Sequence, residues 1–486
     1  MDCLKRTPDR FLWYGTGGFR GDASVVEPAF ARCGALACLR SKVLGGSVVG
    51  VMVTASHNPE RDNGLKITEQ DGRMLTQSWE ALAEKCVNAE DGVESLNEIL
   101  KSFPESQQSN RAVVVVGRDT RESSHKLSEL VLAGASAFDS EVHDVGEVTT
   151  PELHWIVRSR NSSSALPAYR DAMASALSSG IQGLSVDCAN GIGALALKDI
   201  AGRARISGIS IFNDRKDKGI NLNCGADYVQ KENTVPVGHI PADRSASLDG
   251  DADRMVYYRS QDDLFELVDG DKILAFVMRH LNGMNDLKTL RIGAVYTAYT
   301  NGACVAYLRT MSSLELVCAK TGVKHLEEEA RKFDIGAYWE PNGHGTVLFS
   351  DQATTLLKST GTIDPLQTAN QAVGDGIANL IMLETLFAQT SGGFASLTGI
   401  FRSFPSCNAV VKVSDKSKFQ TEDADEQKCT YMLSISMSQV DRQKALVVHC
   451  QARRGFCFPY MVQKRLAEST HMDMIPGQRE HLVGNF

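Results

Sequence analysis

Short runs of apolar and β-branched residues alternate with longer helix-like stretches along most of this chain. Four of the runs, at residues 48–54, 112–117, 183–186 and 291–296, predict buried parallel strands, because each is followed by a polar turn and then by a segment with helical periodicity. Repeated units of this kind predict an α/β fold in which helices cover both faces of each sheet. After about residue 400 the pattern changes; residues 410–413 predict one more strand, and the last thirty residues show no clear period.

Composition places the chain among cytosolic globular proteins. With 486 residues it is too long for one hydrophobic core, and three or four domains are expected. Its net charge of −8 argues against non-specific nucleic-acid binding, which requires Lys and Arg to neutralise phosphates. The apolar runs are far too short to span a membrane, and the charged N-terminus excludes a signal peptide there. The 12 cysteines show no metal-binding spacing, so we expect reduced thiols in a cytoplasmic protein and no zinc site.

The first motif with chemical potential is a serine turn. The motif Thr54-Ala55-Ser56 follows the apolar run 48–53 directly, and Asn58-Pro59 turns the chain away from helix. A serine hydroxyl needs a base or a charge-stabilising neighbourhood to act as a nucleophile, and His57 and Lys66 are the nearby candidates. A capping turn rich in small polar residues is the alternative interpretation of such a segment.

The second motif is an acidic loop, Asp249-Gly250-Asp251-Ala252-Asp253-Arg254. Three carboxylates at alternating positions can converge on one hard cation. A calcium EF-hand is excluded, because its sixth position would be Arg254 instead of Gly and its twelfth Ser260 instead of Glu. Three Asp ligands and an outside phosphate oxygen suit Mg²⁺, which would neutralise a phosphoryl group during transfer.

Two further loops combine glycine with polar side chains. Residues 340–345, Glu-Pro-Asn-Gly-His-Gly, offer a carboxylate, an amide and an imidazole to sugar hydroxyls. Residues 14–20, Tyr-Gly-Thr-Gly-Gly-Phe-Arg, offer backbone N–H groups and Arg20 to a phosphate. Each loop alone is also compatible with an ordinary turn.

Together these motifs resemble those of the α-D-phosphohexomutase superfamily, over about residues 14–450. Within it, residues 186–194, 212–214, 223–227, 320–326 and 340–345 are similar to the eukaryotic phosphoacetylglucosamine mutases. Relatives that act on glucose or mannose phosphates usually carry a serine in the sugar loop where this chain has Asn342.

The resemblance implies four domains around a central cleft. Three are α/β domains with mixed sheets: residues 1–178 with the phosphoserine loop, 179–289 with the magnesium loop and 290–400 with the sugar-binding loop. The fourth, residues 401–486, would be a C-terminal α+β domain, and here it looks incomplete or frame-shifted, because its phosphate-binding loop is not recognisable.

The resemblance also implies roles for the motif residues. Ser56 would be the phosphorylated nucleophile and would complete the Mg²⁺ site. The remaining residues are the magnesium ligands Asp249, Asp251 and Asp253, the sugar contacts Glu340, Pro341 and Asn342 with His344 beside them, and the transfer-site residues Arg20, His57, Lys66 and Arg254. Which group acts as general base stays open.

The implied reaction is the interconversion of N-acetylglucosamine 6-phosphate and N-acetylglucosamine 1-phosphate in UDP-N-acetylglucosamine biosynthesis. The phosphoserine would donate to the free hydroxyl, and the resulting 1,6-bisphosphate would turn around and return the other phosphate. A sugar 1,6-bisphosphate would serve as activator and Mg²⁺ as cofactor. The partner is then a small-molecule sugar phosphate, and no protein partner is indicated.

The chain departs from the family pattern in its last domain. An Arg-Pro-Ser-Gly-Thr-Glu loop and an Arg-Val-Tyr-Ala strand are expected near residues 454–471 and are absent. Read from the third base of each codon, Met461-Val462 must encode glycine, and the following codons permit Thr-Glu and then, three residues later, Arg-Val-Tyr-Ala. This agreement suggests a one-base frame change near residues 457–460.

Two alternative functions are open. The first is a nicotinamide-dependent enzyme. The spacing of a dinucleotide-binding fingerprint is present in Gly191-x-Gly193-x-x-Ala196 and Asp214, although residues 187–190 separate the glycines from the strand. The second alternative is a non-catalytic relic of the mutase family that keeps the sugar and metal loops and lacks the phosphate loop.

The frame-change hypothesis predicts the nucleotide sequence across codons 450–475. If the hypothesis is right, transcript and genome carry GTA for Val462, CAG for Gln463 and TCT for Ser469. Other codons at these three positions would mean that the shifted frame never encoded the phosphate loop.

Overall fold

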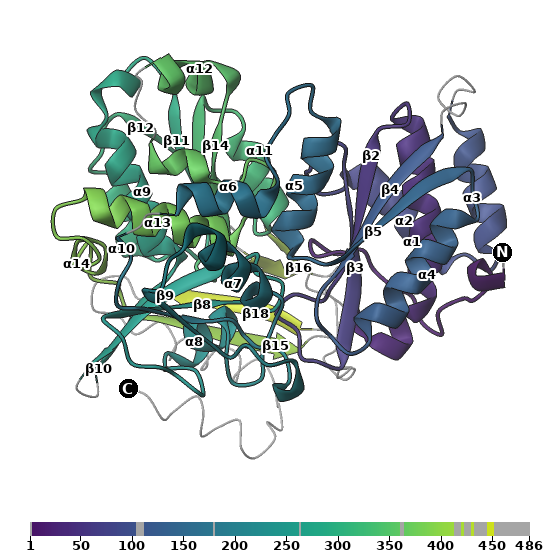
Figure 1. Cartoon of the computed structure of the whole chain (residues 1–486), viewed down its shortest axis with the longest axis horizontal. Coiled ribbons are helices and arrows are strands. Elements are labelled where there is room, and N and C mark those ends of the chain that lie inside the picture. Colours follow the sequence, from purple (N-terminus) through teal and green to yellow (C-terminus); the bar gives the residue numbers. More distant parts are fainter. Residues whose placement is uncertain are drawn as a thin grey trace.

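The computed structural model describes residues 2–103, 111–177, 180–261, 264–359, 364–412, 419–421, 429–431 and 445–451. Its described part contains three mixed α/β units, each built on one sheet (Figure 1). The mixed-sheet α/β architecture expected from the sequence is thereby confirmed. The four strands predicted from apolar runs are all present, as β2 (Val48–Val53), β4 (Ala112–Arg118), β6 (Leu184–Asp187) and β11 (Ile292–Thr297).

The first unit, on the right in Figure 1, holds a sheet of order β1-β3-β2-β4-β5. Strands β2, β4 and β5 (Ser140–Glu147) run parallel, whereas β3 (Asp62–Thr68) runs antiparallel to both β2 and β1 (Phe19–Asp22). The unit's helices are α1 (Ala23–Val43), α2 (Gln77–Asn88), α3 (Gly92–Lys101), α4 (Ser124–Ser136) and α5 (Thr150–Asn161), with the 3-10 turn η1 (Asp2–Leu4) at the N-terminus.

The second unit holds a sheet of order β10-β9-β8-β6-β7. Strands β6, β7 (Ile209–Phe212) and β8 (Arg244–Leu248) are parallel, and β9 (Met255–Gln261) and β10 (Leu264–Val268) add an antiparallel edge. Its helices are α6 (Tyr169–Ala176), α7 (Gly193–Ala204) and α8 (Ala226–Glu232), with η3 (Lys216–Lys218).

The third unit, at the upper left of Figure 1, has the sheet order β12-β11-β13-β14. Strand β11 is parallel to β12 (Leu314–Ala319) and to β13 (Ile335–Trp339), and β14 (Gly345–Phe349) is antiparallel to β13. The helical segments of this part of the chain are α9 (Gly270–Gly283), η4 (Asn285–Leu287), α10 (Gly302–Leu308), α11 (Val323–Ala330), α12 (Asp351–Ser359), η5 (Pro365–Thr368), α13 (Gly376–Gln389) and α14 (Ala395–Thr398).

Beyond residue 400 the structure describes two strand pairs. Strand β15 (Ser406–Lys412), which contains most of the strand predicted at 410–413, pairs antiparallel with β18 (Ala445–Gln451), and β16 (Phe419–Thr421) pairs with β17 (Cys429–Tyr431). The proposed frame change near residues 457–460 lies outside the described residues and stays a prediction. Each of the three sheets falls inside one of the domain ranges predicted above, whose boundaries also stay predictions.

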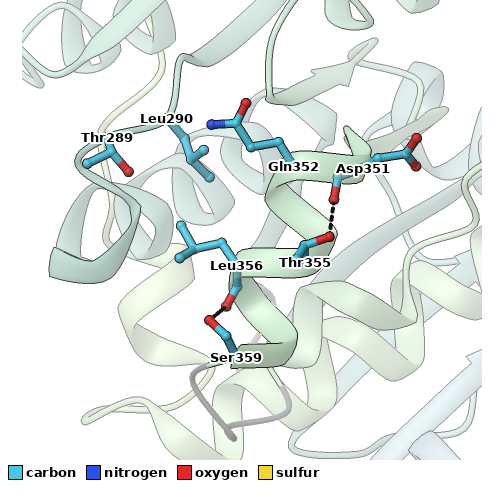
Figure 2. A pocket seen from close by; sticks show the side chains of 7 residues that line it. All are labelled: Thr289, Leu290, Asp351, Gln352, Thr355, Leu356 and Ser359. Carbon is cyan, nitrogen blue, oxygen red and sulfur yellow. Dashed lines mark hydrogen bonds between the residues drawn. The ribbon is translucent and has the colours of Figure 1, made fainter.

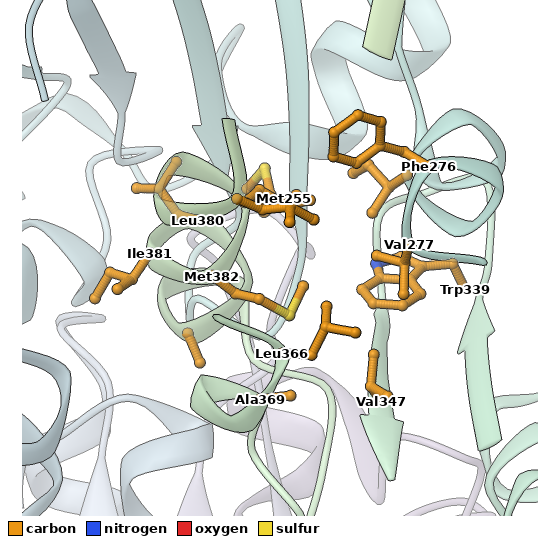
Figure 3. Close-up of a cluster of buried hydrophobic side chains, with 14 of the residues drawn as sticks. Met255, Phe276, Val277, Trp339, Val347, Leu366, Ala369, Leu380, Ile381 and Met382 are labelled. Atoms are coloured by element: carbon orange, nitrogen blue, oxygen red, sulfur yellow. The ribbon is translucent and has the colours of Figure 1, made fainter. Parts of the chain in front are cut away.

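The hydrophobic cores divide the molecule differently from the sheets. Side chains of the second and third units form one continuous cluster, joined through α13. Figure 3 shows part of it, where Met382 of α13 lies among Met255 of the second sheet and Trp339 and Val347 of the third. The first sheet packs in a cluster of its own around α1. The first unit therefore meets the others mainly through loops, which is where the polar motifs lie.

Two further findings concern the cysteines and the helices. The eight cysteines of the described chain up to residue 400 are free, and six of them are buried. None of the helices in the described part of the chain combines the length and apolarity needed to cross a bilayer.

A buried carboxylate ties α6 to α13. Asp375 caps α13 by accepting a hydrogen bond from the backbone N–H of Ala378 (2.9 Å), and it accepts the Tyr169 hydroxyl at 2.9 Å. Burial raises the pKa of Asp375 from its ordinary value of 3.8 to about 6. The folded state therefore holds the proton over a range of pH in which the unfolded chain has released it.

This shift predicts a pH dependence of stability with a defined sign. The stabilisation due to protonated Asp375 is complete below pH 3.8 and is lost as the pH rises through about 6, a total of up to about 3 kcal/mol. Asp375→Asn keeps a capping side chain and removes the ionisation, so urea unfolding of the variant should lack this decline. Parallel pH profiles for wild type and variant would contradict the assignment.

Candidate active site

The serine turn lies at the carboxyl end of β2, as the sequence predicts. Ser56 is fully buried and has a left-handed backbone conformation, with φ 51°, which is uncommon for a residue with a side chain. Its hydroxyl donates a 2.7 Å hydrogen bond to Oδ2 of Asp249 in the second unit. The serine and the acidic loop, 193 residues apart in sequence, are therefore in direct contact.

A buried arginine holds the serine turn from within the first unit. Arg121 follows β4 and forms a salt bridge with Asp119, whose carboxylate also accepts the Thr54 hydroxyl at 2.7 Å. The Arg121 guanidinium donates to four backbone carbonyls of the turn, those of Ser56, Asn58, Pro59 and Asp62, over 2.6–3.1 Å. Such convergence fixes the path of the turn and offsets the strain at Ser56.

The acidic loop connects β8 to β9 and brings its three carboxylates together. One oxygen from each of Asp249, Asp251 and Asp253 lies within 4.8 Å of the others, and all three residues are buried. Oδ1 of Asp251 and Oδ1 of Asp253 have no hydrogen-bond partner among the described residues. Buried, unpartnered carboxylate oxygens that face one another are costly without a cation. The residues present therefore fit a hard divalent metal.

The three carboxylates have different pKa values. For Asp249, burial is the main cause that raises the pKa well above the ordinary range, and repulsion from Asp253 and Asp251 adds to it. Burial also opposes ionisation of Asp251 and Asp253, but the attraction of the Lys66 ammonium helps to lower the pKa of both. Lys66 Nζ lies 3.2 Å from an oxygen of each. The Thr150 hydroxyl donates to Asp251 at 2.6 Å.

Arg254 and His57 lie beside the loop. Arg254 forms an ion pair with Asp227 of α8, and its Nε has no hydrogen-bond partner among the described residues. Burial, reinforced by the positive charges of Arg254 and Arg20, lowers the pKa of His57 to about 3, so its imidazole is neutral near pH 7. Nδ1 of His57 is buried and likewise lacks a partner within the described chain.

Arg20 lies at the start of β1, within the field of the acidic loop. Burial lowers its pKa, while attraction to Asp251 and Asp253 opposes that shift. Its Nε donates to the Gly17 carbonyl at 3.0 Å, which orients the guanidinium. The glycine loop is only partly free to hold an anion, because the N–H groups of Gly15 and Gly18 are used in mutual backbone hydrogen bonds.

The predicted sugar loop forms the turn between β13 and β14. Glu340 accepts the Tyr299 hydroxyl at 2.7 Å, and Asn342 Oδ1 accepts the His344 backbone N–H at 3.0 Å. Nδ1 of His344 lies 3.6 Å from Oδ1 of Asp253, and its Nε2 has no hydrogen-bond partner in the described structure. The sugar loop is therefore in contact with the acidic loop.

Close backbone packing keeps the sugar loop in this place. The Gly343 carbonyl accepts the Met255 N–H at 3.2 Å, and the carbonyl of Pro341, which is buried, accepts the Gly270 N–H at 3.2 Å. A Cβ at Gly270 would lie 1.9 Å from the Glu340 carbonyl oxygen, and one at Gly343 2.2 Å from that of Met255. Both glycines are needed for this approach.

The structure thus brings together the predicted residues of the serine, acidic and sugar loops and Arg20. Five contributors were not identified from sequence: Asp119, Arg121, Thr150, Asn221 and Tyr299. Three of them follow strands predicted from the sequence, Asp119 and Arg121 after β4 and Tyr299 after β11, so the rule that ligands gather at the carboxyl ends of strands could have found them. Thr150 follows β5, a strand that was not predicted from the sequence, and Asn221 lies in the loop between β7 and α8.

Two features singled out by sequence or shape lie elsewhere or have another role. The cavity in Figure 2 is formed mostly by the outer face of α12, where the Thr355 and Ser359 hydroxyls bond to backbone carbonyls of their own helix. It shares no residue with the site.

The dinucleotide-like motif has a different role. Gly191 packs against Gly250, since a Cβ at Gly191 would lie 2.3 Å from the Gly250 carbonyl oxygen. Asp214 forms a salt bridge with Lys198. Gly191 therefore allows the acidic loop to pack closely against it.

Comparison with protein families matches three stretches of the chain. Residues 269–391 match the model "Phosphoacetylglucosamine mutase AMG1, domain III", and residues 172–256 match domain II of the same protein. Residues 35–95 and 90–167 match "Phosphoglucomutase/phosphomannomutase, alpha/beta/alpha domain I".

Curated relatives match most of the chain. The phosphoacetylglucosamine mutase of rice is 39% identical over 478 residues, covering 86% of this chain and 84% of the relative. The human enzyme of that name is 37% identical with the same coverage, and the fission yeast enzyme is 38% identical, covering 86% and 88%.

Solved structures agree with these matches. The N-acetylphosphoglucosamine mutase of Aspergillus fumigatus, in complex with GlcNAc-6P and magnesium, has a TM-score of 0.81 and 35% identity over 88% of this chain and 87% of its own. An N-acetylglucosamine-phosphate mutase in its substrate complex gives 0.81 and 33%, with 87% of both chains covered. The chain therefore belongs to the phosphoacetylglucosamine mutases, isomerases of the α-D-phosphohexomutase superfamily.

Proposed function

We propose that this protein interconverts N-acetylglucosamine 6-phosphate and N-acetylglucosamine 1-phosphate through a phosphoserine at Ser56 and a 1,6-bisphosphate intermediate. The observation that carries the proposal is the contact between the Ser56 hydroxyl and Asp249, with the sugar loop packed against the same acidic loop. Nucleophile, metal-binding carboxylates and sugar-binding groups therefore share one site.

Ser56 is suited to receive and return a phosphoryl group. Its buried hydroxyl is held at 2.7 Å from a carboxylate oxygen, and Arg20, Lys66 and Arg254 supply positive charge around it. Phosphoryl transfer depends mainly on positioning and on charge stabilisation, and these residues provide both. The identity of the general base stays open. His57, which is neutral near pH 7, and His344 each have a buried nitrogen without a described partner.

Asp249, Asp251 and Asp253 would hold Mg²⁺, with the Ser56 oxygen as the neighbouring ligand. When bound, the ion supplies charge neutralisation for the phosphoryl group. The Aspergillus neighbour is a complex with magnesium, and the two unpartnered oxygens of the triad would be ligands for the same cation in this chain. Lys66 offsets only part of the triad's charge.

The sugar loop would bind the substrate hydroxyls through Glu340, Asn342 and His344, with the Pro341 backbone fixing the turn. Tyr299 holds Glu340 by a 2.7 Å hydrogen bond, so the carboxylate is oriented before substrate enters. The Aspergillus relative binds GlcNAc-6P, and a serine-to-alanine variant of that enzyme is in complex with glucose 1,6-bisphosphate. These ligands support N-acetylglucosamine phosphate as substrate and a sugar 1,6-bisphosphate as activator.

The proposal is tested by following the conversion of N-acetylglucosamine 6-phosphate with Mg²⁺ and glucose 1,6-bisphosphate by ³¹P NMR. Appearance of the 1-phosphate supports it. A chain that binds substrate and Mg²⁺ without turnover would instead match the relic alternative, which nothing in the comparisons supports. The relic alternative rests on the absence of the distal phosphate loop, and residues 454–471, where that loop is expected, lie outside the described residues.

Replacing the nucleophile should abolish turnover. Ser56→Ala should lower kcat at least about 10³-fold, because it removes the hydroxyl that would accept the phosphoryl group beside Asp249. Ser95→Ala is the matched control, since Ser95 is also buried and its hydroxyl has no described hydrogen-bond partner. Turnover of Ser56→Ala close to that of Ser95→Ala would exclude Ser56 as the nucleophile.

Removing one triad carboxylate should weaken metal activation selectively. For Asp251→Asn and for Asp253→Asn, the Mg²⁺ concentration giving half-maximal activity should rise at least about 10-fold. A chelator should abolish wild-type activity, and added Mg²⁺ should restore it. Asp217→Asn, in the same unit but in an exposed salt bridge with Arg215, should leave the Mg²⁺ dependence unchanged. Equal Mg²⁺ dependence in all variants would place the metal elsewhere.

A further inference from the structure

The serine turn is held from both sides of the junction between the first and second units. Arg121 holds it from the first unit, as described above. From the second unit, the Asn221 carboxamide donates to the Ser56 carbonyl at 2.8 Å and to the Asn58 carbonyl at 3.1 Å. The same two carbonyls accept from Arg121 at 2.9 and 2.8 Å. Each carbonyl therefore has one donor from each unit.

The loop that carries Asn221 is itself anchored. The Asn221 backbone N–H donates to the Ala189 carbonyl at 2.9 Å, and its φ of 59° is one that Asn tolerates better than most residues. Next to it, the Ile220 N–H donates to Glu60 of the serine turn at 3.0 Å, and the other Glu60 oxygen accepts the Glu122 N–H. The carboxamide is thus presented to the turn in a fixed position.

Asn221 also lies against the acidic loop. A Cβ at Gly250 would lie 2.8 Å from Asn221 Nδ2 and 2.7 Å from the Ser56 carbonyl oxygen. The carboxamide therefore lies where the serine turn, the acidic loop and its own loop meet. Buried side chains of the first unit form a hydrophobic cluster separate from that of the second, and partly buried Trp155 of α5 packs against the latter. At the serine turn itself the contacts between the units are polar, and they set the position of Ser56 relative to Asp249.

We propose that Asn221 is a positioning residue: its carboxamide holds the strained Ser56 backbone in register with the acidic loop, so that phosphoryl transfer requires the second unit to be docked on the serine turn. The proposal rests on the function proposed above. Asn221 touches neither the reacting hydroxyl nor the sugar loop, so its effect should fall on the rate of transfer and not on substrate affinity.

The test compares variants that keep the left-handed backbone. Asn221→Gly removes the carboxamide and accepts positive φ, whereas Asn221→Asp keeps the shape and turns donors into acceptors that repel both carbonyls. Both should lower kcat about 10- to 100-fold and change KM for the sugar phosphate less than about 2-fold. Asn223→Gly is the matched control: Asn223 has φ 53° in the same loop, and its side chain makes no hydrogen bond to the described residues.

Wild-type kcat in both Asn221 variants, or an effect confined to KM, would overturn the proposal. If thermal melting shows that Asn221→Gly does not fold, the kcat and KM of Asn221→Asp alone test the proposal. A wild-type protein without mutase activity would refute the proposed function. The positioning role of Asn221 would then be tested by comparing crystal structures of the wild type and the variant. There, loss of the left-handed Ser56 conformation in the variant supports positioning, and an unchanged serine turn excludes it.

Discussion

The contact on which the site depends is the hydrogen bond from the Ser56 hydroxyl to Asp249. It joins two units whose hydrophobic cores are separate, and it brings a nucleophile on one sheet to a metal-binding loop on another. Neither unit alone contains the site. The second and third units, in contrast, share a core through α13, so the acidic and sugar loops rest on one packed body. The chemistry therefore lies at the polar junction between that body and the first unit.

Polar groups at this junction are held by many weak constraints instead of one apolar interface. Arg121 and Asn221 each donate to the carbonyls of Ser56 and Asn58, and Lys66 reaches across to two carboxylates of the acidic loop. Close glycine contacts, such as Gly250 on the Ser56 carbonyl, leave little room for movement. An arrangement of this kind can hold reacting groups accurately while the two bodies keep separate cores.

Much of this could be predicted from the sequence, because strand runs and short motifs are local signals. The strands at 48–54 and 112–117 were recognisable from β-branched residues, and they located the serine turn. The acidic loop was recognisable because three Asp residues at alternating positions, with a glycine between them, can converge on one hard cation. The contributions of Asn221 and Thr150 were not, since a single polar residue in a loop or at the start of a helix carries no signal until the fold brings it to its partner. The shared core of the second and third units was likewise hidden, because α13 follows the third sheet in sequence and packs against the second.

The most direct test of the account is to locate the phosphate on the enzyme. The protein would be incubated with glucose 1,6-bisphosphate and Mg²⁺, digested, and analysed by phosphopeptide mass spectrometry. The account predicts one phosphorylated residue, Ser56, and its dephosphorylation when N-acetylglucosamine 6-phosphate is added. Phosphate on another residue, or a Ser56 phosphate that the substrate cannot remove, would contradict it.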